Sequence, residues 1–402
     1  MMSIIRSLKN IKLSVFVLFV ILYFYFMINN FFTDVLSPIA VLAVLIIVIM
    51  GGLQIVVNKG VLYSKFLISL SFWMFWCLLM SLLYFTSFGQ LSSSILWVCA
   101  LFCSFSFVKN DGDVNLIVFG GVCVCIYALY LGVITMDIGN YIKLTVSSDF
   151  DQNENVAIFP LITVPLIMLI DKKIIKWGLL LLILIVILLT ARRTAALCII
   201  FIFIVNIVQE FKENRNTSKS KRYIYTIVIV GVVIYTIYNM LTGTFAELFE
   251  NLLLRFNSIG NDEGSGRMPI YRSVWNGFLQ GNLGEYLIGH GYLGVDRVIH
   301  HTAAHNDFLE YLFDYGIIGA FFYVSLHIYF LKRIMFLYEI KSFFLYSYIV
   351  SYCIFFLYGM LGNIIIYPQY FLLLLKTVDI RSPKTGISVH YSYSLLMAIQ
   401  IY

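Results

Sequence analysis

The residues best suited to chemistry gather in one polar stretch late in the chain. The run 300–310 reads HHTAAHNDFLE. An imidazole titrates near neutral pH, so His305 could act as a general base in a loop at an aqueous boundary. In a helix, His301 and His305 would lie at i and i+4, which is the spacing of zinc-binding pairs. The candidates for a third ligand are Asp307, Glu310 and His290. No cysteine lies nearby, so we expect no metal, and plain surface histidines remain the alternative.

Arginines form the second group. Arg192 and Arg193 stand in LLTARRTA (188–195), a tight turn between two apolar runs. A guanidinium binds phosphate oxygens through a planar fork of N–H donors, so this turn predicts an anion site. Snorkelling to lipid head groups, or pairing with a loop acid, is the alternative. Arg267 and Arg272 lie in SGRMPIYR (265–272) and, taken alone, are more typical of solvated loop charges.

The elements that must position these residues follow from composition. Of 402 residues, 61% are hydrophobic and only 12% are charged, which is too little polar surface for a soluble domain of this length. The apolar runs are about 20 residues long, whereas barrel strands alternate, so we expect an all-α polytopic membrane protein with about 12 transmembrane helices. Scattered basic residues argue against nucleic acid as a partner. The expected spans are residues 13–29, 39–57, 66–84, 92–108, 114–134, 156–170, 174–190, 194–211, 223–242, 310–331, 342–361 and 364–378.

The distribution of cations predicts the topology. With a cytoplasmic N-terminus, most of the 27 Lys and Arg residues fall on the cytoplasmic side, and the run from Lys212 to Arg222 is the strongest marker. Both termini are then cytoplasmic. The chain divides into spans one to nine (1–242, with an outer loop at 135–155), a long ordered outer loop (243–309), and spans ten to twelve with a cytoplasmic tail (310–402).

Several motifs resemble the O-antigen ligase and polymerase superfamily. The specific element is AHNDFLE (304–310) followed by YGIIG (315–319) at the start of a span. Weaker elements agree with it in order: NEN (153–155) before the sixth span, TARRTA (190–195), SGR (265–267) with Trp275 downstream, and GHG (289–291). The resemblance covers roughly residues 150–320 by motif.

That resemblance implies a fold, a chemistry and roles for residues. Members are periplasm-facing glycosyltransferases similar to the GT-C class, which need no metal or cofactor and use glycans carried on undecaprenyl pyrophosphate. By resemblance, Arg193 and Arg267 would grip the donor pyrophosphate, and His305 would orient or deprotonate the attacking hydroxyl. Arg192 stands where the family often has a small residue, so either neighbouring arginine could face the phosphates; Arg272 is a further candidate. The candidates for sugar or acceptor contacts are Asn306, Asp307, Glu310, His301, Tyr271, Trp275 and Asn155.

The leading hypothesis is an O-antigen polymerase of lipopolysaccharide biosynthesis in the bacterial inner membrane. It would join lipid-linked repeat units at the periplasmic face with inversion. An O-antigen ligase, which transfers the glycan to lipid A core, is the alternative. A transporter or flippase would instead show charges buried within spans and half-to-half similarity. The expected partners are the lipid-linked glycans, membrane lipids, a chain-length regulator and a flippase.

Overall fold

The structure is a computed structural model, and it describes residues 72, 75–80, 82–84, 111–135, 158–190, 193–213, 267–300 and 303–361. This part of the chain is helical and contains no strand, which confirms the expected all-α class there. The other expected spans lie outside the described residues, and the count of 12 and the likeness to the GT-C class stay predictions. The helices are α6 (Asp111–Thr135), α8 (Ile158–Ile167), α9 (Lys173–Thr190), α10 (Arg193–Glu213), α13 (Arg267–Leu279), α14 (Leu283–Ile288), the π-helix η5 (Val295–Ile299), α15 (Asp307–Glu339) and α16 (Leu345–Leu361).

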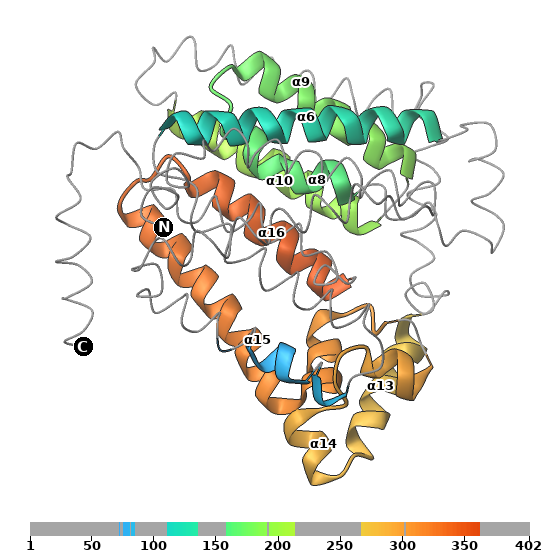
Figure 1. The fold of residues 1–402 in the computed structure, drawn as a ribbon. Helices are drawn as coiled ribbons and strands as arrows, with labels where there is room; N and C mark the ends of the chain where they lie inside the picture. The colour runs from blue at the N-terminus through green and yellow to red at the C-terminus, as the bar shows by residue number, and fades with distance from the viewer. Residues whose placement is uncertain are drawn as a thin grey trace, which may run out of the picture.

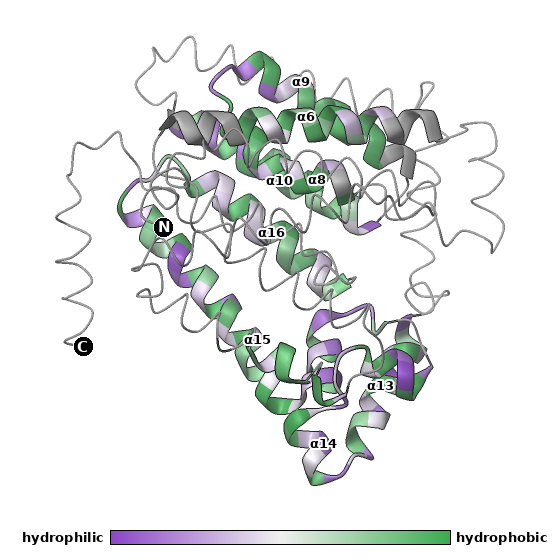
Figure 2. Cartoon of the chain, viewed as in Figure 1, coloured by the Kyte–Doolittle hydropathy of each residue, from purple (hydrophilic) through white to green (hydrophobic). Residues whose placement is uncertain are grey.

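Six of these helices form a bundle, and each coincides with an expected span. Figure 1 shows α6, α8, α9, α10, α15 and α16 packed together, while α13 and α14 form a lobe at one end of α15. Hydrophobic residues predominate along the bundle helices, and hydrophilic residues gather at α13 (Figure 2). Among the described residues, Arg193–Lys212 and Asp307–Glu339 are long and apolar enough to cross a membrane.

Close approach of helices accounts for part of the bundle core. α6 packs on α8, and a Cβ atom at Gly121 would lie 2.5 Å from the Leu166 Cδ1 atom. Small residues of this kind let apolar helices approach one another in a membrane, where van der Waals packing rather than water exclusion holds them together. The interior is filled by aliphatic side chains such as Val164, Leu180 and Ile202, all fully buried.

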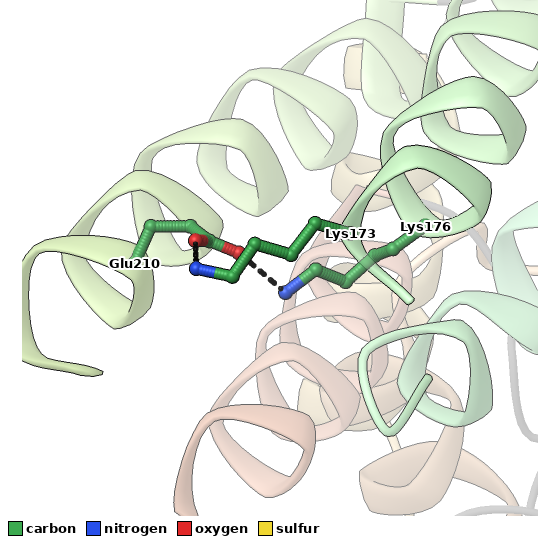
Figure 3. A network of polar contacts seen from close by, with 3 residues as sticks. All are labelled: Lys173, Lys176 and Glu210. Carbon is green, nitrogen blue, oxygen red and sulfur yellow. Dashed lines mark hydrogen bonds and ion pairs between the residues drawn. The ribbon is translucent and has the colours of Figure 1, made fainter. Parts of the chain in front are cut away.

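Basic side chains mark one end of the bundle. Lys173 and Lys176 at the start of α9 both reach Glu210 near the end of α10 (Figure 3), with 3.0 Å between the Lys176 and Glu210 charged groups. The Nζ atom of Lys212 lies 4.7 Å from the ring centroid of Tyr338, near the end of α15. α9 therefore begins where α10 and α15 end. We call this the lysine end, defined by Lys173, Lys176 and Lys212.

The opposite end carries the arginines. Since α10 ends at the lysine end, its first residue, Arg193, lies at the other one. The Nζ atom of Lys212 also lies 5.9 Å from the Tyr346 ring at the start of α16, so Leu361 closes α16 at that same far end. We call it the arginine end. This separation of cations matches the expected topology for the described helices.

α15 turns a sharp corner at Gly316, where φ is 66° and ψ is −169°. Sixteen residues of straight α-helix would rise about 24 Å. Yet the Tyr323 hydroxyl lies only 3.3 Å from the Asp307 carboxylate, and the rings of Phe308 and His327 stack with centroids 5.0 Å apart. The first arm (307–315) therefore folds back along the second arm (317–339).

The corner changes the expected span 310–331. Residues 310–315 belong to the first arm, and the second arm alone, about 34 Å long at 1.5 Å per residue, has the length of a membrane crossing. Apolar side chains exposed by 42–66% repeat along the second arm every three or four residues, as a lipid-facing helix requires. They are Ile317, Phe321, Val324, Ile328, Leu331, Met335 and Tyr338.

Candidate active site

His305 lies in the turn that leads into α15. Its φ of 52° places it in the left-handed region, which few residues other than glycine adopt. The Tyr271 hydroxyl of α13 donates a hydrogen bond to the His305 carbonyl oxygen at 3.2 Å. The next residue, Asn306, caps α15, because its side-chain oxygen accepts from the N–H groups of Phe308 and Leu309 at 3.0 and 3.2 Å. The backbone of the candidate base is thus fixed on both sides.

The end of α16 joins this turn. The Asn306 amide nitrogen donates to the Met360 carbonyl at 3.1 Å, and Arg267 Nη1 donates to the Leu361 carbonyl. The last carbonyls of a helix lack partners within it and carry partial negative charge, so an amide and a guanidinium are suitable partners. We call the meeting point of Arg267, Tyr271, His305, Asn306 and the end of α16 the junction. It brings together two residues that the sequence proposed from separate motifs, Arg267 and His305.

Three acidic residues line the inward face of the first arm and are buried there: Asp307, Glu310 and Asp314, exposed by 0%, 5% and 2%. Glu310 accepts the Ala304 backbone N–H at 2.6 Å, and Asp314 accepts the Val295 N–H at 3.1 Å. The carboxylates therefore attach the preceding loop to the first arm. The predicted sugar or acceptor contacts of Asp307 and Glu310 remain predictions, since the contacts described here are with the chain itself.

The corner of α15 is held by the GHG segment. The carbonyls of Phe313 and Asp314, next to the corner, accept the backbone N–H groups of His290 and Gly291 at 3.0 and 2.6 Å. A Cβ atom at Gly316 would lie 2.3 Å from the Leu287 carbonyl oxygen, so only glycine fits there. Two glycine motifs about 25 residues apart thus form one structural unit, a pairing that the sequence analysis missed. The only sequence signal of this corner was Gly316, a glycine within an otherwise helical run.

Two side chains from the expected span 66–84 also bind the corner. The Tyr84 hydroxyl donates to the Gly289 carbonyl at 3.0 Å, and the Trp76 indole N–H donates to the Tyr315 carbonyl at 3.3 Å. Trp76 satisfies a backbone acceptor that an uninterrupted α15 would pair internally, and Tyr84 holds the GHG segment beside the corner. Nothing in the spacing of Trp76 and Tyr84 identified them as functional support.

A comparison with known protein families matches the part of the chain that holds most of this site. Residues 178–324 match the family model described as O-antigen ligase. This region of the chain is therefore similar to the O-antigen ligase family. The match confirms the resemblance to the ligase and polymerase superfamily and indicates a membrane enzyme of that type. No curated protein matches the chain.

The matched region, residues 178–324, contains most of the proposed site residues. Arg193 is the first residue of α10 at the arginine end, where the helix dipole adds positive potential to the guanidinium. Arg272 and Trp275 lie exposed on α13, and Trp275 is 46% exposed. The remaining candidates, Arg192, His301 and Asn155, lie outside the described residues.

Burial shifts the pKa values of two side chains in the lobe, His290 and Tyr271. The His290 ring stacks on Phe313 with 4.3 Å between centroids, and burial, reinforced by Arg297, lowers the His290 pKa although Glu285 opposes the shift. Burial raises the pKa of Tyr271 despite the nearby Arg267, so the phenol keeps the proton that it donates to His305. Within the described residues, no three His, Cys, Asp or Glu side chains are grouped to hold a metal.

Proposed function

We propose that the protein is an O-antigen polymerase that joins lipid-linked oligosaccharide repeat units at the outer face of the bacterial inner membrane. The observation that carries this proposal is the junction, where Arg267 and His305 share one end of a bundle of apolar helices. A donor linked to undecaprenyl pyrophosphate presents its phosphates at the membrane surface. Under the positive-inside rule the lysine end faces the cytoplasm, so the arginine end and its junction face the periplasm.

The chemistry assigns a role to each group. The acceptor hydroxyl attacks the anomeric carbon of the donor sugar, and the bond from that carbon to the pyrophosphate oxygen breaks in the same step, so the configuration inverts. His305 takes the proton of the attacking hydroxyl. Arg193 and Arg267 stabilise the negative charge that develops on the leaving pyrophosphate, a role that a divalent metal plays in other transferases.

The structure supports Arg267 as a phosphate ligand in one further respect. A guanidinium has five N–H donors in a planar fork, and the contact of Nη1 with Leu361 uses one of them. This contact orients the remaining donors without neutralising the cation, because the partner is a carbonyl and not a carboxylate. A preorganised cation loses less conformational entropy when it binds phosphate.

The direct test is transfer between purified lipid-linked repeat units by the full-length protein in nanodiscs. We expect His305→Ala to lower kcat by about 10²–10⁴-fold, the usual contribution of a general base. We expect Arg267→Ala mainly to raise the KM for the donor. Asp296→Asn, an exposed change in the same lobe, should leave both constants unchanged. Wild-type turnover in His305→Ala would exclude the proposed base.

The second candidate is an O-antigen ligase, which the description of the matching family favours. The two activities share a donor and differ in the acceptor. Deletion of the gene followed by gel analysis of lipopolysaccharide separates them: core with one repeat unit indicates a polymerase, and bare core with accumulating lipid-linked polymer indicates a ligase. A chain-length regulator and a flippase would be partners of either enzyme.

A further inference from the structure

Tyr323 lies on the second arm of α15, wholly buried, with its hydroxyl 3.3 Å from the Asp307 carboxylate. We propose that Tyr323 is a positioning residue that holds His305 in its reactive place through Asp307. This inference rests on the proposed function, because it assumes that His305 does the chemistry. Tyr323 is 0% exposed and therefore cannot touch substrate, so its action would be indirect.

Three consecutive residues are each tied to a different element. The His305 carbonyl accepts from Tyr271 of α13, the Asn306 amide donates to Met360 of α16, and Asp307 accepts from Tyr323 of the second arm. Three attachments to three separate helices fix both the place and the orientation of a short segment. Tyr323 supplies the only one of these three that comes from the membrane-crossing arm itself.

The packing around this contact leaves little freedom. A Cβ atom at Gly359 of α16 would lie 3.0 Å from the Asp307 carboxylate and 3.1 Å from the Tyr323 hydroxyl. The α16 backbone therefore closes directly over the pair. The Tyr323 ring stacks parallel to Tyr311 with centroids 4.5 Å apart and meets Phe308 edge-on at 5.0 Å. The ring is thus held on the first arm independently of its hydroxyl.

Because the ring and the hydroxyl do separate work, Tyr323→Phe is an informative change. It keeps the stacking and removes only the donor to Asp307. The matched control is Tyr352→Phe, which removes a hydroxyl 3.4 Å from His327 Nδ1, within the same aromatic group but not in contact with the 305–307 segment in the described structure. A small displacement of a catalytic group can cost up to about 10²-fold in rate.

The experiment measures transfer kinetics and hydrogen–deuterium exchange of the full-length protein in nanodiscs. We expect Tyr323→Phe to lower kcat about tenfold or more, with the donor KM within twofold, and to speed exchange of the 304–309 amides. Tyr352→Phe should do neither. In Asp307→Ala, adding Tyr323→Phe should lower kcat little further, because both changes remove the same contact.

Several results would overturn the positioning role. They are an unchanged kcat in Tyr323→Phe, an equal loss of kcat in Tyr352→Phe, fully multiplicative losses of kcat with Asp307→Ala, or a lower kcat without faster exchange at 304–309. Failure of the proposed function looks different: the wild type would show no transfer, or His305→Ala would remain active. The exchange measurement does not depend on activity, so it still tests whether Tyr323 fixes the segment.

Discussion

Replacing Gly316 by alanine should break the corner of α15. The residue has φ 66° and ψ −169°, a region of backbone conformation that is essentially restricted to glycine. The new Cβ atom would also lie 2.3 Å from the Leu287 carbonyl oxygen and 2.6 Å from the Ile288 nitrogen. Both are backbone atoms of α14, so neither can move aside as a flexible side chain could.

The size of the effect follows from these two terms. A non-glycine residue in a sparsely populated backbone region costs about 1–3 kcal/mol. Overpacking against a fixed neighbour costs about 1–3 kcal/mol more. We therefore expect Gly316→Ala to lower the free energy of unfolding by about 2–6 kcal/mol. Activity should fall further still, because the corner carries the first arm and with it the His305 turn.

The assay is the apparent melting temperature in detergent at a fixed scan rate, together with transfer activity. A loss of this size corresponds to a fall of about 5 °C or more. The control is Gly178→Ala in α9, where a Cβ atom would meet nothing within 4 Å and where alanine is the better helix former. Gly178→Ala should keep the wild-type melting temperature or exceed it. If Gly316→Ala also kept the wild-type melting temperature, the assigned role of the corner would be refuted.

Two further predictions concern buried groups near the junction. Glu310→Ala should cost about 1–3 kcal/mol, because the buried Ala304 N–H loses its acceptor, whereas Glu310→Gln keeps an oxygen there and should cost less; melting curves of the two variants decide. His290 has a lowered pKa, so the folded state binds its proton less readily than the unfolded state does. The stability that it contributes is complete above about pH 6.5 and is lost as the pH falls toward the folded pKa. His290→Gln should flatten the acid side of a melting-temperature profile between pH 5 and 8, and an unchanged profile would contradict this assignment.

Within the described residues, hydropathy was sufficient to locate the helices of the bundle. The apolar runs at 174–190 and 194–211 became α9 and α10, and their cations separated to opposite ends, since both features depend on local composition. The convergence of Arg267 and His305 was expected only from the resemblance, because nothing local joins residues 38 positions apart. The junction shows the physical link: Arg267 of α13 donates to Leu361 of α16, and Tyr271, one turn along α13, donates to the His305 carbonyl.

The corner and the buried carboxylates could not be read from the sequence. YGIIGAFF (315–322) continues an apolar run, and membrane helices tolerate glycine, so Gly316 gave no sign of a reversal. Glu310 was proposed, from the resemblance, as a sugar or acceptor contact, and its structural contact was not foreseen. Its partner is the N–H of Ala304, and a backbone group has no sequence signature.

The ion pairs at the lysine end have a consequence for register. Lys173 and Lys176 grip the same carboxylate, so α9 and α10 cannot slide past each other without separating charges, one of which, on Lys176, is almost wholly buried. A slip of one helical turn would displace Arg193 by about 5.4 Å, which is more than the length of a hydrogen bond. The two lysines thus fix the register of α9 against α10. Contacts at the lysine end of the bundle therefore determine the position of Arg193 at the arginine end.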